Sequence, residues 1–119
     1  MSTAVIQRAT HGLIRRESAS HGVTARQAVD RIARRLRLAP GTLTRILRGT
    51  AKRVTADARD ALIAAYVADL SRQVRALEHE KQVLLQMGFG PSHRDMDAVE
   101  TALAQARQAI SRMAGEVRR

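Results

Sequence analysis

The sequence has no cysteine and no tryptophan, and Tyr66 and Phe89 are its only aromatic residues. Without cysteine there is no disulfide framework, no thiol nucleophile and no cysteine-ligated zinc site. The shortage of aromatic side chains argues against recognition of single-stranded nucleic acid by base stacking, which uses aromatic platforms. It also requires an aliphatic core, which favours helices over a β-sandwich or barrel.

Long apolar runs are missing as well. No segment approaches the 18 or so consecutive apolar residues of a membrane span, and the N-terminus lacks the apolar core of a secretory signal. We therefore expect a cytoplasmic protein with no membrane partner. At 119 residues, 45% of them hydrophobic, the chain has room for one or two small units. Its abundant Ala and Arg are typical of GC-rich bacterial or phage coding.

No pattern in the sequence points to catalysis or to a bound cofactor. We find no paired carboxylates, no nucleophile with a neighbouring base and no metal-ligand spacing. The glycines and proline at 88–91 form a turn rather than a phosphate-binding loop, because no Lys-Ser or Lys-Thr follows them. We expect no catalytic residues, no metal, no cofactor and no small-molecule effector, and hence a protein that is not an enzyme.

The positive charge is concentrated in the N-terminal half. Residues 1–55 contain twelve basic and two acidic residues, a net charge of +10, whereas residues 56–119 contain nine of each and are neutral. A codon bias alone would spread the arginines evenly along the chain. The asymmetry therefore favours a polyanion partner bound by the N-terminal half.

Residues 29–48 have the apolar spacing of two short helices that meet at a sharp turn. In a twenty-residue frame starting at Val29, five positions that must be apolar hold Ile32, Leu36, Leu38, Leu43 and Ile46. Ala33, in the first helix, occupies the position where the two helices approach too closely for a larger side chain. Pro40 interrupts the first helical period and can open a second helix at its first position. This pattern predicts a helix-turn-helix.

The frame resembles the helix-turn-helix of lambda repressor, Cro and their relatives over about residues 20–50. It departs from that group at two positions. Arg37 stands where the group has glycine, and a left-handed arginine costs about 1 kcal/mol. Ala39 stands where Ser or Thr would cap the second helix, so one amide loses its usual acceptor.

Thr24 and Gln27 form a capping box that begins the first helix of the motif, which we expect to end at Leu36. In the related folds this helix crosses the DNA backbone. The resemblance therefore implies phosphate contacts from its outward-facing basic residues, Arg31, Arg34 and Arg35. A solvated basic face without a ligand is the alternative interpretation of each.

Pro40–Arg48, closed by Gly49, is the expected recognition helix. An exposed arginine on this helix can donate two hydrogen bonds to guanine O6 and N7. We assign base contacts to Gly41, Thr44 and Arg45. We assign backbone contacts to Thr42, Arg48, Lys52 and Arg53.

Three further helices are expected around this motif, at Ala4–Ser18, at Ala56–Met87 and after a second capping box formed by Ser92 and Asp95. The last one has a coiled-coil spacing of 3 and 4 residues from Met96 to Val117. Since the connecting loop spans about four residues, the last two helices should form an antiparallel hairpin. We predict an all-α fold with a DNA-binding domain at 1–54 and a hairpin at 55–119. The hairpin residues expected to mediate oligomerisation are Leu77, Leu84, Leu103, Ile110 and Met113.

These features favour a sequence-specific protein for double-stranded DNA, a nucleoid-associated bacterial or phage transcription regulator that forms a homodimer or larger homo-oligomer. Two alternatives remain. Phage small terminase subunits share the layout of a helix-turn-helix joined to an antiparallel hairpin, although no motif matches residue by residue. A basic amphipathic protein could also bind RNA or an anionic membrane surface.

Overall fold

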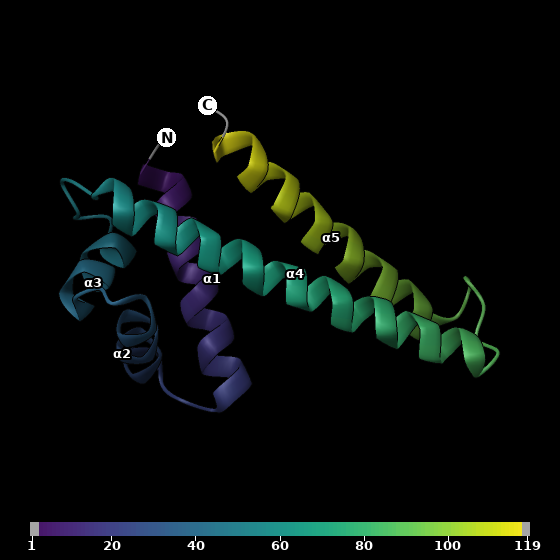
Figure 1. The fold of residues 1–119 in the computed structure, drawn as a ribbon. Coiled ribbons are helices and arrows are strands. Elements are labelled where there is room, and N and C mark those ends of the chain that lie inside the picture. The colour runs from purple at the N-terminus through teal and green to yellow at the C-terminus, as the bar shows by residue number, and fades with distance from the viewer. Residues whose placement is uncertain (1–2, 118–119) are drawn as a thin grey trace. The chain divides into compact units, whose positions relative to one another are not determined.

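The computed structural model describes residues 3–117, and side chains from 4 to 115. Within these residues the chain is all-helical and contains no strand, which confirms the predicted fold class (Figure 1). The helices are α1 (Thr3–His21), α2 (Ala25–Leu36), α3 (Pro40–Arg48), α4 (Ala56–Gln86) and α5 (Arg94–Val117).

The chain divides into two compact units, Met1–Tyr66 and Val67–Arg119. The sequence predicted a boundary at residue 54, just before α4 begins. The division instead lies within α4, after Tyr66. Leu62 accounts for this position, because it is fully buried in the core of the first unit. The N-terminal part of α4 thus belongs to the helix-turn-helix unit.

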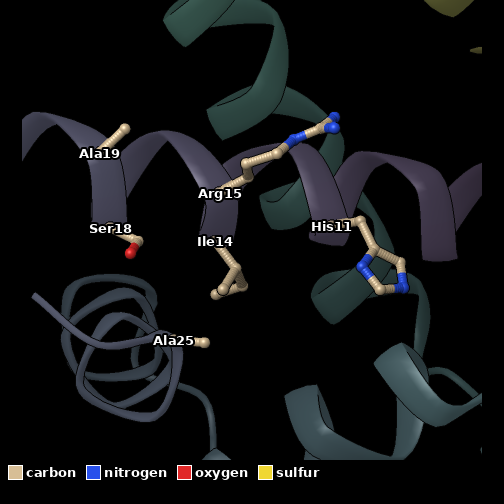
Figure 2. A pocket seen from close by; sticks show the side chains of 6 residues that line it. All are labelled: His11, Ile14, Arg15, Ser18, Ala19 and Ala25. Atoms are coloured by element: carbon tan, nitrogen blue, oxygen red, sulfur yellow. The ribbon is translucent and has the colours of Figure 1, made fainter.

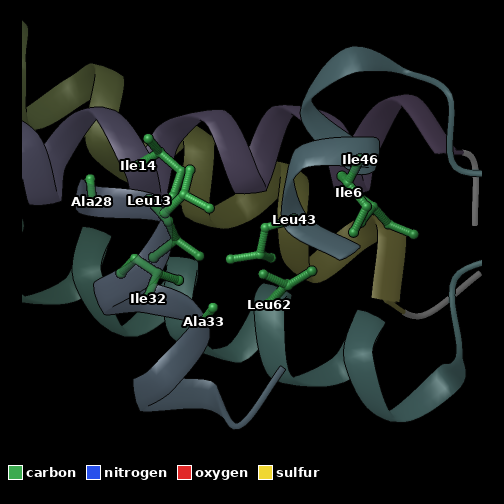
Figure 3. Packing of buried hydrophobic residues seen from close by; sticks show 10 residues of the cluster. Ile6, Leu13, Ile14, Ala28, Ile32, Ala33, Leu43, Ile46 and Leu62 are labelled. Carbon is green, nitrogen blue, oxygen red and sulfur yellow. The ribbon is translucent and has the colours of Figure 1, made fainter. Parts of the chain in front are cut away.

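Aliphatic side chains from α1, α2, α3 and the start of α4 form one core in the first unit (Figure 3). The buried positions of the predicted frame, Ile32, Ala33, Leu43 and Ile46, are all fully buried. Leu36 and Leu38 are partly buried and pack against the same cluster. The apolar frame therefore predicted the packing of α2 on α3.

The turn between α2 and α3 has the predicted backbone. Arg37 is left-handed, with φ 59° and ψ 42°, and is the one non-glycine residue with positive φ among residues 3–117. The Leu38 amide donates to the Ala33 carbonyl at 2.8 Å, which closes α2 in a Schellman arrangement. This hydrogen bond and the partial burial of Leu38 offset the strain at Arg37.

The helix ends of the motif follow the sequence closely. Thr24 and Gln27 exchange both hydrogen bonds of the predicted capping box, at 2.9 and 3.1 Å. Ala39 provides no side-chain cap for α3, also as predicted. Gly49 ends α3 with φ 72°.

Helix α1 is longer than predicted, because it continues past Ser18 to His21. Its C-terminal end is set by Gly22, whose φ of 62° permits the Val23 amide to donate to the Ser18 carbonyl. Gly12 lies in the middle of α1 against the Tyr66 ring, and a Cβ at this position would overlap that ring. The glycine therefore permits a close approach of α4 to α1 within the first unit.

In the second unit α4 and α5 form the predicted antiparallel hairpin. Its core contains Leu84, Met96, Val99 and Leu103, with Val74, Leu77 and Phe89 packed against them. Two ion pairs join the helices in antiparallel register, Glu78 with Arg107 at 3.1 Å and Lys81 with Glu100 at 3.4 Å. The Val117 side chain, the last position of the predicted seam, lies outside the described residues.

The connection between α4 and α5 differs from the prediction. It spans residues 87–93 rather than about four residues. The Ser92–Asp95 capping box was wrong, since α5 begins at Arg94 and the Asp95 amide donates to Nδ1 of His93 at 3.1 Å. The His93 ring stacks on Phe89 with their centroids 4.1 Å apart, which holds the imidazole at the helix terminus.

Candidate nucleic-acid interface

Helix α3 presents a polar face to solvent. Gly41, Arg45 and Arg48 are exposed, and Thr42 and Thr44 are half-buried. The Arg45 side chain folds back along the helix, so that one guanidinium nitrogen would lie 3.4 Å from a Cβ at position 41. The absence of a side chain at Gly41 therefore leaves room for Arg45 along this face.

Thr44 is partly satisfied within the helix, because its hydroxyl donates to the Pro40 carbonyl at 3.1 Å. The oxygen lone pairs can still accept a hydrogen bond from outside. Thr42 uses its amide for the Ala39 carbonyl at 3.0 Å, which leaves its hydroxyl as the group available to a phosphate. The two threonines thus differ in what they can offer to a ligand.

The basic residues on α3 and in the segment between α3 and α4 have no acidic partner among the side chains described, residues 4–115. Arg45, Arg48, Lys52 and Arg53 are exposed, and none of them forms an ion pair there. Lys52 and Arg53 lie in the irregular segment between Gly49 and α4. These four charges are therefore available to an external anion.

Two of the three α2 arginines assigned to phosphates, Arg31 and Arg35, form ion pairs within the protein. Glu17 of α1 is buried, with 5% of its side chain exposed, and forms ion pairs with Arg35 at 3.0 Å and Arg31 at 3.5 Å, while Nε2 of His21 lies 3.0 Å from the same carboxylate. The arginine side chains are about half exposed. Arg34 is exposed and has no ion-pair partner in the described chain.

A groove of about 610 Å³ lies between the N-terminal half of α2 and the length of α3. From α3 it is lined by Pro40, Gly41, Thr44, Leu47 and Arg48, and from α2 by Ala25, Arg26, Val29 and Asp30, with Ile14 of α1 as its remaining contact. The groove thus includes Gly41, Thr44 and Arg48 of the α3 residues that the sequence assigned to DNA, whereas Arg45 and Thr42 do not line it. It also brings Arg26, which sequence reasoning did not select, next to that face.

A second depression of about 550 Å³ lies between α1 and the start of α2. Figure 2 shows Ile14 and Ser18 pointing from α1 toward Ala25, whereas the Arg15 guanidinium lies on the opposite side of the α1 ribbon. Of the polar side chains that line the depression, Arg15 is directed away from it in this view, and the Ser18 hydroxyl already donates to the Val23 carbonyl. We assign no ligand to it.

The residues expected to mediate oligomerisation lie mainly inside the hairpin. Leu84 and Leu103 are buried in its core and Leu77 packs against them. Met113 is also buried, and Ile110 is half-buried. The large hydrophobic side chains that remain exposed are instead Val83, Leu85 and Met87, close to the end of α4.

Sequence reasoning did not select two residues of the first unit, Glu17 and Arg26, as part of the candidate site. The pairing of Glu17 with His21 within α1 was missed, because the sequence placed the end of this helix at Ser18, before His21. The pairing of Glu17 with α2 was not visible, since it depends on how two helices cross. Arg26 could have been found from its spacing of 3 and 4 residues to Val29 and Asp30, which places all three on one helical face.

The described part of the chain contains no group of three or more His, Asp or Glu side chains placed to hold a metal ion. None of its helices combines the length and apolar character needed to cross a bilayer. Comparisons of the chain with protein-family models, with curated proteins and with solved structures found no match.

Proposed function

We propose that this protein binds double-stranded DNA in a sequence-specific manner and acts as a nucleoid-associated transcription regulator of a bacterium or phage. The observation that carries the proposal is the α3 face, where Arg45 and Arg48 are exposed and form no ion pair with an acidic residue of the described chain. The charge distribution supports it, because the first 55 residues carry the whole net charge of +10. A basic unit with a helix whose polar residues face solvent suits the major groove of a duplex.

Within this proposal the residues of α3 have separate roles. Arg45 is long enough to donate two hydrogen bonds to one guanine, and Thr44 can contact a neighbouring base edge. Gly41 permits close approach of the α3 backbone. Arg48, Thr42 and the Lys52–Arg53 pair bind phosphates, which fixes position without reading sequence.

The test begins with selection of bound sequences from random duplex DNA. We expect Arg45→Ala to weaken binding to the selected sequence by about 1–3 kcal/mol, roughly 5- to 150-fold in affinity. Binding to a scrambled duplex should change little. The matched control is Arg8→Ala, which removes an exposed arginine from α1. Equal losses on both duplexes, or failure to select any sequence, would contradict sequence-specific recognition by α3.

Self-association through the second unit completes the proposal. One helix-turn-helix buries a small interface, and two copies on half-sites about one helical turn apart are the usual way to gain affinity. Light scattering should find a homodimer. A ring of about eight or more copies would instead support a DNA-packaging role like that of small terminase subunits, which the hairpin attached to the helix-turn-helix unit also suits.

RNA or an anionic membrane surface is the competing polyanion. Competition between duplex DNA and single-stranded RNA, titrated at two salt concentrations, tells these two nucleic acids apart as partners. Both are polyanions that a basic surface attracts, but recognition of single-stranded RNA also relies on its bases stacking on aromatic side chains. We expect the duplex to compete better. Preference for RNA would overturn the proposal.

A further inference from the structure

We propose that the contact of α2 with the DNA backbone is made by Arg26, across the groove from Arg48, and that Arg31 and Arg35 are positioning residues that hold α2 to α1. This inference rests on the proposed function and concerns which arginines bind phosphate. It differs from the assignment that the sequence alone suggested.

The first argument is the engagement of Arg31 and Arg35. Both side chains reach Glu17, whose carboxylate is 5% exposed. A phosphate that took either guanidinium would remove a partner from a buried carboxylate, and a buried charge is tolerated only when it is paired. Arg26 can bind a phosphate without breaking an ion pair, since it is exposed and forms none among the described residues.

The second argument is direction. At about 100° per residue, Arg31 lies about 140° and Arg35 about 180° around the α2 axis from Arg26. Arg26 lines the groove together with Gly41, Thr44 and Arg48 of α3, whereas Arg31, Arg34 and Arg35 do not line it. A duplex seated on α3 therefore meets Arg26 first.

The occupant that fits this groove is a phosphodiester backbone. Arg26 and Arg48 provide one guanidinium from each side, and guanidinium groups match phosphate oxygens in geometry as well as charge. Asp30 also lines the groove and opposes an anion there. Because two arginines face one carboxylate, the groove keeps a net positive charge.

Four single variants test the assignment on the full chain: Arg26→Gln, Arg48→Gln, Arg31→Gln and Arg35→Gln. The probe is a short duplex of mixed sequence, with affinity measured between about 50 and 200 mM salt. Loss of one phosphate contact makes the plot of log affinity against log salt shallower by about 1. We expect this change for Arg26→Gln and Arg48→Gln, and no change in slope for Arg31→Gln or Arg35→Gln.

Thermal unfolding provides the second readout. Arg31→Gln and Arg35→Gln should lower the melting temperature, because Glu17 loses a partner, whereas Arg26→Gln should not. Asp30→Asn should tighten binding to any duplex. A slope that is unchanged in Arg26→Gln but shallower in Arg31→Gln or Arg35→Gln would overturn the inference, as would equal slope changes in all four. If the unmodified protein itself shows no salt-dependent duplex binding, the proposed function fails first.

Discussion

The two units of the chain bury aliphatic side chains to different extents. The largest fully buried side chains among the described residues lie mostly in the first unit, at Thr10, Leu13, Ile32, Leu43, Ile46 and Leu62, and the second unit contributes Met96. The exposed large hydrophobic residues, Val83, Leu85 and Met87, all belong to the second unit. Several helices that cross can enclose a side chain, whereas a two-helix hairpin leaves one side of each helix open.

The two units also differ in net charge. Thirteen basic and four acidic residues give the first unit a net charge of +9, and eight basic and seven acidic residues give the second a net charge of +1. A closed, strongly basic unit suits a polyanion, and an open, nearly neutral hairpin suits another helical surface. The comparison thus agrees with the proposal that the first unit binds DNA and the second self-associates.

The largest expected effect compares the two cores. Leu43→Ala should destabilise the protein toward the upper end of about 2–5 kcal/mol, because Leu43 is fully buried in the first core and its neighbours can collapse only partly into the cavity. Leu103→Ala should lie toward the lower end, since a hairpin can close around the smaller side chain. Urea unfolding followed by circular dichroism measures both. Equal losses would contradict the difference in enclosure.

A pair of glycines gives the next comparison, with opposite signs. Gly12→Ala should destabilise by about 1–3 kcal/mol, because the new methyl group overlaps the Tyr66 ring. Gly115→Ala in α5 should stabilise by about 0.5–1 kcal/mol, since nothing lies within 4 Å of the added Cβ. Thermal unfolding of both variants provides the measurement. Adding Tyr66→Ala should relieve the overlap, and Gly12→Ala should then no longer destabilise.

The smallest expected effect compares the ion pairs of the two units. Glu17→Gln should cost about 1–2 kcal/mol, because it leaves Arg31, Arg35 and His21 without their buried carboxylate. Glu78→Gln is the matched variant in the hairpin, where the carboxylate is 52% exposed, and should cost about 0–1 kcal/mol. Denaturant titrations at low and high salt measure both. A larger loss for Glu78→Gln would reverse the comparison.

Sequence reasoning was most accurate where the cause was local. The left-handed Arg37, the Thr24–Gln27 capping box and the missing cap at Ala39 all followed from residues within a few positions of one another. Two errors in helix bounds also had local causes. The end of α1 depends on Gly22, and the start of α5 depends on His93 being held by Phe89.

The candidate site was predicted less completely than the fold. Of the α3 residues chosen from the sequence, Gly41, Thr44, Arg45 and Arg48 lie within about 100° of one another around the helix axis, because the helical period fixes which side chains share a face. The basic residues of α2 could not be ranked in this way. Their roles depend on Glu17 and on the groove, which exist only after α1, α2 and α3 have packed.

By itself, the sequence determined the helices, the sharp turn and the concentration of positive charge in one half of the chain, because periodicity, capping and composition act over short distances. Tertiary structure alone decided which arginines bind Glu17, why Gly12 must lack a side chain, and where α4 passes from one unit to the other. These outcomes join residues far apart in the chain, and they depend on how helices cross when their apolar faces leave water.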